Sequence, residues 1–210
     1  MDSGYDNALA FALAFVLRWE GGFANDPHDS GGRTMKGVTQ RVYDAWRASQ
    51  GKPRGDVGKI TDAEVAAIYS DNYWKKALCN ELQPHLDLVQ FDTAVNMGPN
   101  RAVKILQQAV GVASDGDFGP ATRQACAACS APVAVARYCS IREALYRRFA
   151  EARGQDRFLA GWLNRLNDLR ALVGVSGYVR RGGSEPDFGE TDWIERIPDL
   201  APGEPLEDWQ

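Results

Sequence analysis

Signals that begin and end α-helices recur along most of this 210-residue chain, and they constrain its fold more than any other feature. Thr61 and Glu64 have the Thr-x-x-Glu spacing of a capping box, in which two residues bond each other's backbone N–H groups at a helix N-terminus. Gly98 and Gly111 each follow an apolar segment as glycines that end a helix. The pattern predicts a mainly α-helical fold, with helices over residues 5–18, 39–48, 61–77, 85–97, 99–110, 120–129, 132–153 and 157–173.

Residues 21–38 interrupt this helical pattern directly after the first predicted helix. They are rich in Gly, Asp and Pro and contain short alternating stretches, which is typical of a loop or a small hairpin rather than a helix. We therefore expect a small glycine-rich loop or β-hairpin at this point of the chain.

The composition is that of a globular chain, with 44% hydrophobic and 25% charged residues. It excludes a disordered chain, which would have fewer apolar residues and a higher net charge. Four cysteines are too few for a small disulfide-stabilised domain. Cys126 and Cys129 have a C-x-x-C spacing, but the sequence offers no second close pair of zinc ligands. We interpret the thiols as buried side chains and predict no metal site.

The net charge of −4 is unevenly distributed. Of the 24 basic and 28 acidic residues, two and nine lie in residues 181–210, which leaves 22 against 19 in residues 1–180. We expect residues 181–210 to form an extended acidic tail that either shields the body or only aids solubility. Eight arginines and four acidic residues lie between Arg137 and Arg170, which suits either anionic wall polymers or a solvated helix face. The chain lacks the charge and motifs of a nucleic-acid-binding protein, and we predict no such partner.

The most apolar run, residues 8–17, is far shorter than the roughly 20 residues that a membrane-spanning helix needs. Asp2 and Asp6 precede it and no basic residue does, which is unlike a secretory signal. We interpret the run as a buried helix and predict no membrane insertion. We expect a protein that is made in the cytoplasm without a signal peptide and reaches its place of action through a holin or a secretion system.

Two carboxyl groups in contrasting surroundings form the candidate catalytic pair. Glu20 ends the apolar first helix beside Trp19 and Phe23, and apolar neighbours favour the protonated form that a general acid requires. Asp29 lies in the polar glycine-rich segment, where it stays ionised, and Thr34 offers a hydroxyl for a water molecule or a sugar. Such contrasting carboxyl groups are used to break glycosidic bonds. Spacing alone leaves open a helix-terminal glutamate followed by an ordinary turn.

The motif Glu20-Gly-Gly-Phe-x-x-Asp-Pro-x-Asp-x-Gly-Gly-x-Thr-x-x-Gly-Val-Thr resembles the signature of glycoside hydrolase family 108, the lysozyme-like N-acetylmuramidases of bacteria and phages. The resemblance implies a lysozyme-like helical fold and Glu20 as the catalytic acid. A shorter similarity to the Glu/Asp/Thr triad of phage-type lysozymes suggests Asp29 as the second carboxylate and Thr34 as the residue that orients the water. Asp26 remains the alternative second carboxylate. Carboxyl groups about 5–5.5 Å apart imply retention, and about 6.5–9.5 Å apart inversion, so the sequence leaves the stereochemistry open.

An aromatic cluster, Tyr69-x-x-x-Tyr73-Trp74, lies on the helix that begins at the capping box, and members of this family carry a Tyr-Trp near this point. Aromatic rings stack on the apolar faces of sugars, which makes Tyr73 and Trp74 candidate substrate-binding residues. The alternative interpretation is that both are core aromatics.

The next helical segment, from Val89 to Ala102, resembles the start of the peptidoglycan-binding part that follows the catalytic part in this family. Gln90, Asp92 and Asn96 are polar residues on this otherwise apolar helix, and Asp92 and Asn96 are neighbours at i and i+4. They are candidates for hydrogen bonds to sugar hydroxyls. An internal network between the two parts of the chain is the alternative.

A second motif, Asp115-Gly-Asp-Phe-Gly-Pro-x-Thr122 after Leu106-Gln-Gln, is similar to the motif of peptidoglycan-binding domains. Most of it is interpreted as structural, because Asp115-Gly116 forms a turn and Gly119-Pro120 begins a helix. Phe118 is expected to fill the core.

The sequence thus predicts a catalytic lysozyme-like lobe over residues 1–85 and a helical peptidoglycan-binding lobe over residues 86–180, with a sugar cleft between them. The expected reaction is hydrolysis of the β-1,4 bond between N-acetylmuramic acid and N-acetylglucosamine by a monomer that needs no cofactor, because two carboxyl groups and water suffice. Three alternatives stay open, namely a lytic transglycosylase, a chitinase or chitosanase, and a non-catalytic wall-binding protein.

Overall fold

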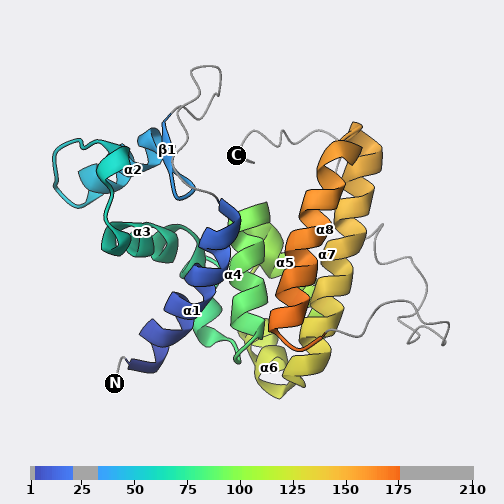
Figure 1. The fold of residues 1–210 in the computed structure, drawn as a ribbon. Coiled ribbons are helices and arrows are strands. Elements are labelled where there is room, and N and C mark those ends of the chain that lie inside the picture. The colour runs from blue at the N-terminus through green and yellow to red at the C-terminus, as the bar shows by residue number, and fades with distance from the viewer. Residues whose placement is uncertain (1–2, 21–32, 176–210) are drawn as a thin grey trace. The chain divides into compact units, whose positions relative to one another are not determined.

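The structure, a computed structural model, describes residues 3–20 and 33–175 (Figure 1). Within these residues the fold is mainly α-helical, with one two-stranded antiparallel hairpin directly after the first helix, as predicted. The helices are α1 (Ser3–Glu20), α2 (Gln40–Ser49), α3 (Asp62–Tyr69), α4 (Leu86–Met97), α5 (Pro99–Val110), α6 (Pro120–Ala128), α7 (Ala131–Arg153) and α8 (Asp156–Leu172). The strands are β1 (Thr34–Met35) and β2 (Val38–Thr39), and short helical turns lie at η1 (Val57–Lys59), η2 (Ser70–Trp74) and η3 (Cys79–Glu81).

Local side-chain bonds explain where several helices begin and end. The capping box of α3 is present, because Glu64 N donates to Thr61 Oγ1 at 3.2 Å and Thr61 N donates to Glu64 Oε2 at 3.1 Å. Thr39 caps α2 by accepting a hydrogen bond of 3.3 Å from Val42 N. Gly98 ends α4 at a φ of 85°, a value that favours glycine.

The helix predicted over residues 61–77 differs from the structure in its second half. The α-helix ends at Tyr69 and continues as a π-helical turn, in which Lys75 N donates to Ser70 O at 2.9 Å. At about 100° per residue, positions i and i+5 of an α-helix lie on different faces, and the wider π-turn rotates them toward one face. Tyr69 and Trp74 consequently both pack edge-on against Phe91 of α4, at ring distances of 6.4 and 5.3 Å.

The chain forms two compact units that divide after Ala102. In the first unit α4 is the central element and packs against α1, η2 and η3. The apolar run of α1 is helical, as predicted, but only one face of it is buried, through Ala12, Leu13, Phe15 and Val16, whereas Phe11 is 54% exposed. In the part of the chain that the structure describes, no helix combines the length and the apolar character needed to cross a membrane.

The second unit begins at Val103 and contains α6, the long hairpin of α7 and α8, and most of α5. Gly154, at a φ of 61°, ends α7 and lets the chain reverse into α8, so the two helices pack side by side along their length (Figure 1). Tyr146 stacks on Trp162 at 5.4 Å between them. Leu166 and Leu169, from the predicted apolar stripe of α8, are fully buried.

Gln107 holds the turn that carries the Asp115-Gly116 motif. Its side chain donates to Asp115 Oδ1 at 2.7 Å and to Thr122 Oγ1 at 3.1 Å, and accepts a bond of 2.9 Å from Gly116 N. This motif is therefore structural here, as expected. The expectation for Phe118 was wrong: it is half-buried beside the Arg123 guanidinium, 5.4 Å from the ring centre, instead of filling the core. The four cysteines are thiols that form no disulfide, and all except the half-buried Cys129 are buried.

Candidate functional site

The candidate site is centred on Glu20, the last residue of α1. Its side chain is half-buried and faces the turn of the β-hairpin. Oε2 of Glu20 lies 3.2 Å from the position that a Cβ atom would occupy at Gly37. The proposed second carboxylate, Asp29, and its alternative Asp26 lie outside the described residues. The carboxylate pair itself therefore stays a prediction.

The hairpin turn brings the backbone close to this carboxyl group. Thr34 pairs with Thr39, and Met35 with Val38, which leaves a two-residue turn of Lys36 and Gly37 with φ values of 52° and 74°. Two successive positive φ angles are the geometry of a type I′ turn, which suits a glycine. A side chain at Gly37 would overlap the Tyr69 hydroxyl and press on Glu20. The absence of a side chain at Gly37 is thus what allows the three groups to meet.

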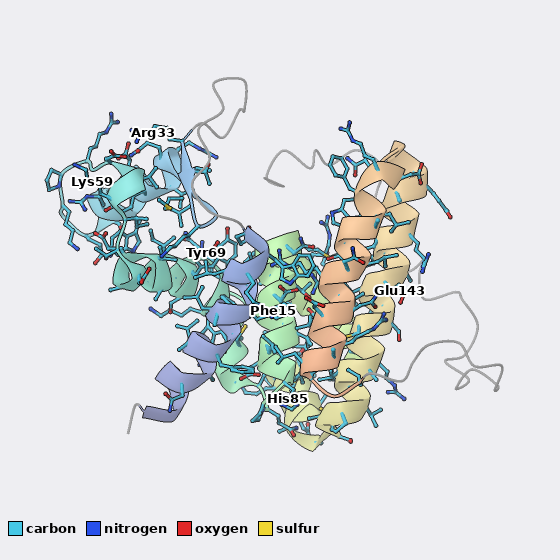
Figure 2. The ribbon with its side chains drawn as sticks, in the orientation of Figure 1. Phe15, Arg33, Lys59, Tyr69, His85 and Glu143 are labelled. Atoms are coloured by element: carbon cyan, nitrogen blue, oxygen red, sulfur yellow. The ribbon has the colours of Figure 1, made fainter. Side chains whose placement is uncertain are left out.

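Tyr69 joins this site from the end of α3. It is only 2% exposed, and its hydroxyl group donates a hydrogen bond of 3.0 Å to the carbonyl oxygen of Lys36. Figure 2 shows its side chain between α3 and the C-terminal end of α1. The Tyr69 hydroxyl and the Glu20 carboxyl group both lie within contact distance of one point beside Gly37. The site therefore brings together the carboxyl group of Glu20, the phenol of Tyr69 and the backbone turn at Gly37.

Thr34 is half-buried on β1 and so belongs to the same hairpin as Gly37. Ion pairs hold this hairpin in place on the neighbouring segments, because Arg33 contacts Asp56 at 2.9 Å and Lys36 pairs with Asp62. The backbone N–H of Gly58, more than Arg33, keeps the pKa of Asp56 below its ordinary value. These contacts fix the hairpin against η1 and the start of α3.

The two aromatic candidates have different surroundings. Tyr73 is half-buried, and its ring lies 5.6 Å from that of Tyr69 in a tilted arrangement. Trp74 is only 1% exposed and packs on Phe91, as a core side chain does. The π-turn thus leaves Tyr73 beside the site while Trp74 supports it from within.

The polar candidates on α4 are mostly internal. Gln90 and Asp92 have no exposed surface, whereas Asn96 is half-buried. Gln90 Nε2 donates to the carbonyl oxygen of Ala77 at 3.1 Å, and this bond ties α4 to the segment that follows the π-turn. Both residues of this hydrogen bond lie within the first unit. Contact of these three residues with substrate stays a prediction.

Sequence reasoning gave no role to Gly37 or to Tyr69, although both lie in motifs that it singled out. For Gly37 the available signal was its place between two short β-type stretches, where a two-residue turn needs a positive φ. For Tyr69 no local signal exists, because its partner Lys36 lies 33 residues away. No cluster of three His, Cys, Asp or Glu side chains that could hold a metal ion occurs within residues 3–20 and 33–175.

Comparison with known proteins adds three findings. The family model of Glycosyl hydrolase 108 matches residues 13–98, which include Glu20, Thr34, Gly37 and Tyr69. The model of a predicted peptidoglycan domain matches residues 101–167. Among solved structures, SagA of Brucella abortus is 31% identical, with a TM-score of 0.65 over 81% of this chain and 95% of that one. No curated protein matches the sequence.

Proposed function

The chain belongs to the glycosyl hydrolase 108 family, and from this premise we propose that it hydrolyses the β-1,4 bond between N-acetylmuramic acid and N-acetylglucosamine, with Glu20 as the general acid. It is a glycoside hydrolase that acts on peptidoglycan.

The observation that carries the proposal is the position of the Glu20 carboxyl group against Gly37. The missing side chain at Gly37 leaves room for the Tyr69 hydroxyl and the half-buried Glu20 carboxyl group to lie beside the same turn, which fixes the position of the acid at the end of α1. Glu20 in its protonated form donates its proton to the oxygen of the leaving sugar. Positive charge then develops on the muramic acid ring, and a water molecule supplies the hydroxyl group that completes hydrolysis.

The second carboxylate is assigned from the motif alone. Asp29, or Asp26 in its place, stabilises the developing positive charge or activates the attacking water. Thr34 lies on the hairpin beside Gly37, where its hydroxyl group orients that water. No metal or organic cofactor takes part, because two carboxyl groups and water provide all the chemistry that this bond requires.

Substrate contacts are assigned to the candidates that retain some exposed surface. The ring of Tyr73 stacks on a sugar face, and Asn96 hydrogen-bonds to a sugar hydroxyl. Trp74, Gln90 and Asp92 support these contacts from within the first unit. The protein reaches peptidoglycan through a holin or a secretion system after synthesis in the cytoplasm.

The test compares wild type with Glu20→Gln on purified sacculi and identifies the new sugar ends by mass spectrometry. Wild type releases fragments that end in reducing N-acetylmuramic acid, and Glu20→Gln stays folded but releases almost none. Clearance of sacculi by Glu20→Gln at near the wild-type rate would remove the assignment of the acid.

The same digestion separates the remaining alternatives. Anhydro-muramic ends would indicate a lytic transglycosylase, and new ends at N-acetylglucosamine would place the cut at the other bond. Activity on chitin but not on sacculi would indicate a chitinase. Retention on sacculi without any release would indicate a wall-binding protein that does not catalyse.

A further inference from the structure

A pocket of about 330 Å³ lies wholly within the second unit and is lined by the end of α5, by α6 and by the first turns of α7. Figure 1 labels these three helices. This volume is within the range of small-molecule sites. Most of its wall consists of side chains no larger than valine, namely Ala109, Val110, Ala125, Ala128, Val133 and Ala134.

A single positively charged side chain, that of Arg137, lines this mostly apolar pocket. Arg137 lines it and is exposed, and within residues 3–20 and 33–175 it has no ion-pair, hydrogen-bond or aromatic partner. Its neighbours on the α7–α8 hairpin are engaged differently, since Arg147 and Arg170 both pair with Glu143, at 2.7 and 2.8 Å. Burial would raise the pKa of Glu143, but the hydrogen bonds and positive charges of these two arginines together keep it below its ordinary value. Arg137 is thus a guanidinium group available to an anion from outside.

We propose that this pocket binds the carboxylate end of the alanine-containing stem peptides of peptidoglycan, with Arg137 pairing with the terminal carboxylate and the alanine and valine wall receiving the methyl groups. The inference rests on the proposed function, because peptidoglycan is the polymer that supplies such peptides. It names a ligand group for the second unit that is distinct from the sugar bond cleaved in the first.

The chemistry of the wall favours this peptide end over other parts of the polymer. A planar guanidinium group forms two parallel hydrogen bonds with a carboxylate, and small apolar side chains leave room for methyl groups. Sugar rings would require several polar partners and an aromatic platform, whereas Ser130 and Cys129 are the only other polar side chains of the wall. Because Arg137 is exposed, the ion pair contributes modestly and affinity in the millimolar range is expected.

Cys129 provides a reporter inside the same wall. It is half-buried, its thiol donates to Cys126 O at 3.2 Å, and burial raises its pKa. The other three cysteines are buried, so an alkylating reagent reacts with Cys129 first. A ligand in the pocket would shield this thiol, and the readout needs no catalysis.

The experiment measures the rate of Cys129 alkylation in the full chain by iodoacetamide and peptide mapping. The probes are N-acetyl-D-alanyl-D-alanine and its C-terminal amide, which lacks the negative charge. At about 10 mM the acid is expected to slow alkylation at least about threefold, and the amide to have little effect. Equal protection by acid and amide, or none by either, would overturn the proposal.

Two variants and one control assign the protection to the pocket. Arg137→Gln should abolish protection by the acid, and Ala128→Phe, at an exposed wall position, should abolish it by filling the space. Arg157→Gln is the matched control, because Arg157 is an exposed arginine that lies 4.5 Å from the Phe158 ring and not at the pocket. It should leave protection unchanged. Loss of protection in all three variants, or in none, contradicts the inference, while the Glu20→Gln digestion reports on the proposed function independently.

Discussion

The Tyr69 hydroxyl group donates a 3.0 Å hydrogen bond to the carbonyl oxygen of Lys36, and this bond ties the end of α3 to the turn that faces Glu20. Two segments 33 residues apart are thereby held together beside the proposed acid. The position of the carboxyl group consequently depends on a residue that does not need to touch the substrate.

Tyr69→Phe removes this bond and keeps the ring. We expect the free energy of unfolding to fall by about 1 kcal/mol, since the carbonyl group of the half-buried Lys36 loses this partner. Release of muropeptides should fall further, by about tenfold, because small displacements of a catalytic group are costly. Urea unfolding and sacculus digestion measure the two effects.

Tyr43→Phe is the matched control for that prediction. The Tyr43 hydroxyl donates to Glu64 Oε2 at 2.9 Å, at a distance from Gly37, so its loss should cost similar stability and leave digestion nearly unchanged. If both variants lost activity in proportion to their stability, Tyr69 would have no positioning role.

Gly37→Ala should destabilise the fold more than the same substitution at another glycine with a positive φ. The left-handed backbone alone costs about 1–2 kcal/mol with a side chain, and here the new Cβ atom would also overlap the Tyr69 hydroxyl. Gly51→Ala has a similar φ of 66° and nothing within 4 Å of the new atom, so it isolates the backbone cost. In thermal unfolding, the Tm of Gly37→Ala should be clearly lower than that of Gly51→Ala.

A double variant tests whether the overlap with Tyr69 is the cause. Gly37→Ala combined with Tyr69→Phe lacks the hydroxyl group, so the two losses of stability should add up to more than the loss of the double variant. Strict additivity would mean that the overlap is relieved in some other way.

The sequence predicted the parts of this site that depend on local signals. The capping box at Thr61 and the glycine that ends α4 specify helix ends through bonds within a few residues, and both occur as expected. The end of α1 at Glu20 follows from the apolar run that precedes it.

What the sequence could not predict are the contacts between segments that are distant along the chain. The π-turn at residues 70–74 brings both Tyr69 and Trp74 against Phe91, and no helical periodicity in the sequence encodes that turn. For the same reason, the sequence carries no sign of the hydrogen bond that Gln90 donates to the carbonyl oxygen of Ala77. Burial of a polar side chain depends on whether the fold supplies a partner.

Glu64 makes the stability of the first unit depend on pH. The backbone N–H of Thr61, ahead of bonds from Tyr43 and Arg47, lowers the pKa of Glu64 below its ordinary 4.5 despite burial. A carboxyl group whose pKa is lower in the folded state stabilises the fold above the unfolded pKa, and this contribution disappears as the pH falls through the folded pKa. The stability difference between wild type and Glu64→Gln should therefore be full above pH 4.5 and shrink at lower pH. Urea unfolding across this range measures it.

Asp71→Asn serves as the control for the pH series. Asp71 forms an exposed i,i+4 ion pair with Lys75 at 2.6 Å, and such pairs add little stability. Its effect should be small at every pH. A difference between wild type and Glu64→Gln that stays constant down to pH 3 would contradict the assignment.

Two neighbouring glutamines of α5, Gln107 and Gln108, should respond very differently in stability to replacement by leucine. Gln107 is 1% exposed and its amide bonds to Asp115, Gly116 and Thr122, so Gln107→Leu leaves several polar groups without partners and should cost about 2–4 kcal/mol. The bond from Gln107 is also the main cause of the low pKa of Asp115, which should rise toward 3.8 in the variant. Gln108→Leu replaces a half-buried side chain whose Oε1 has no hydrogen-bond partner within the described residues, and it should be neutral or stabilising. Thermal unfolding and an NMR titration of Asp115 check both variants, and equal losses of stability would show that the Gln107 bonds do not hold the turn.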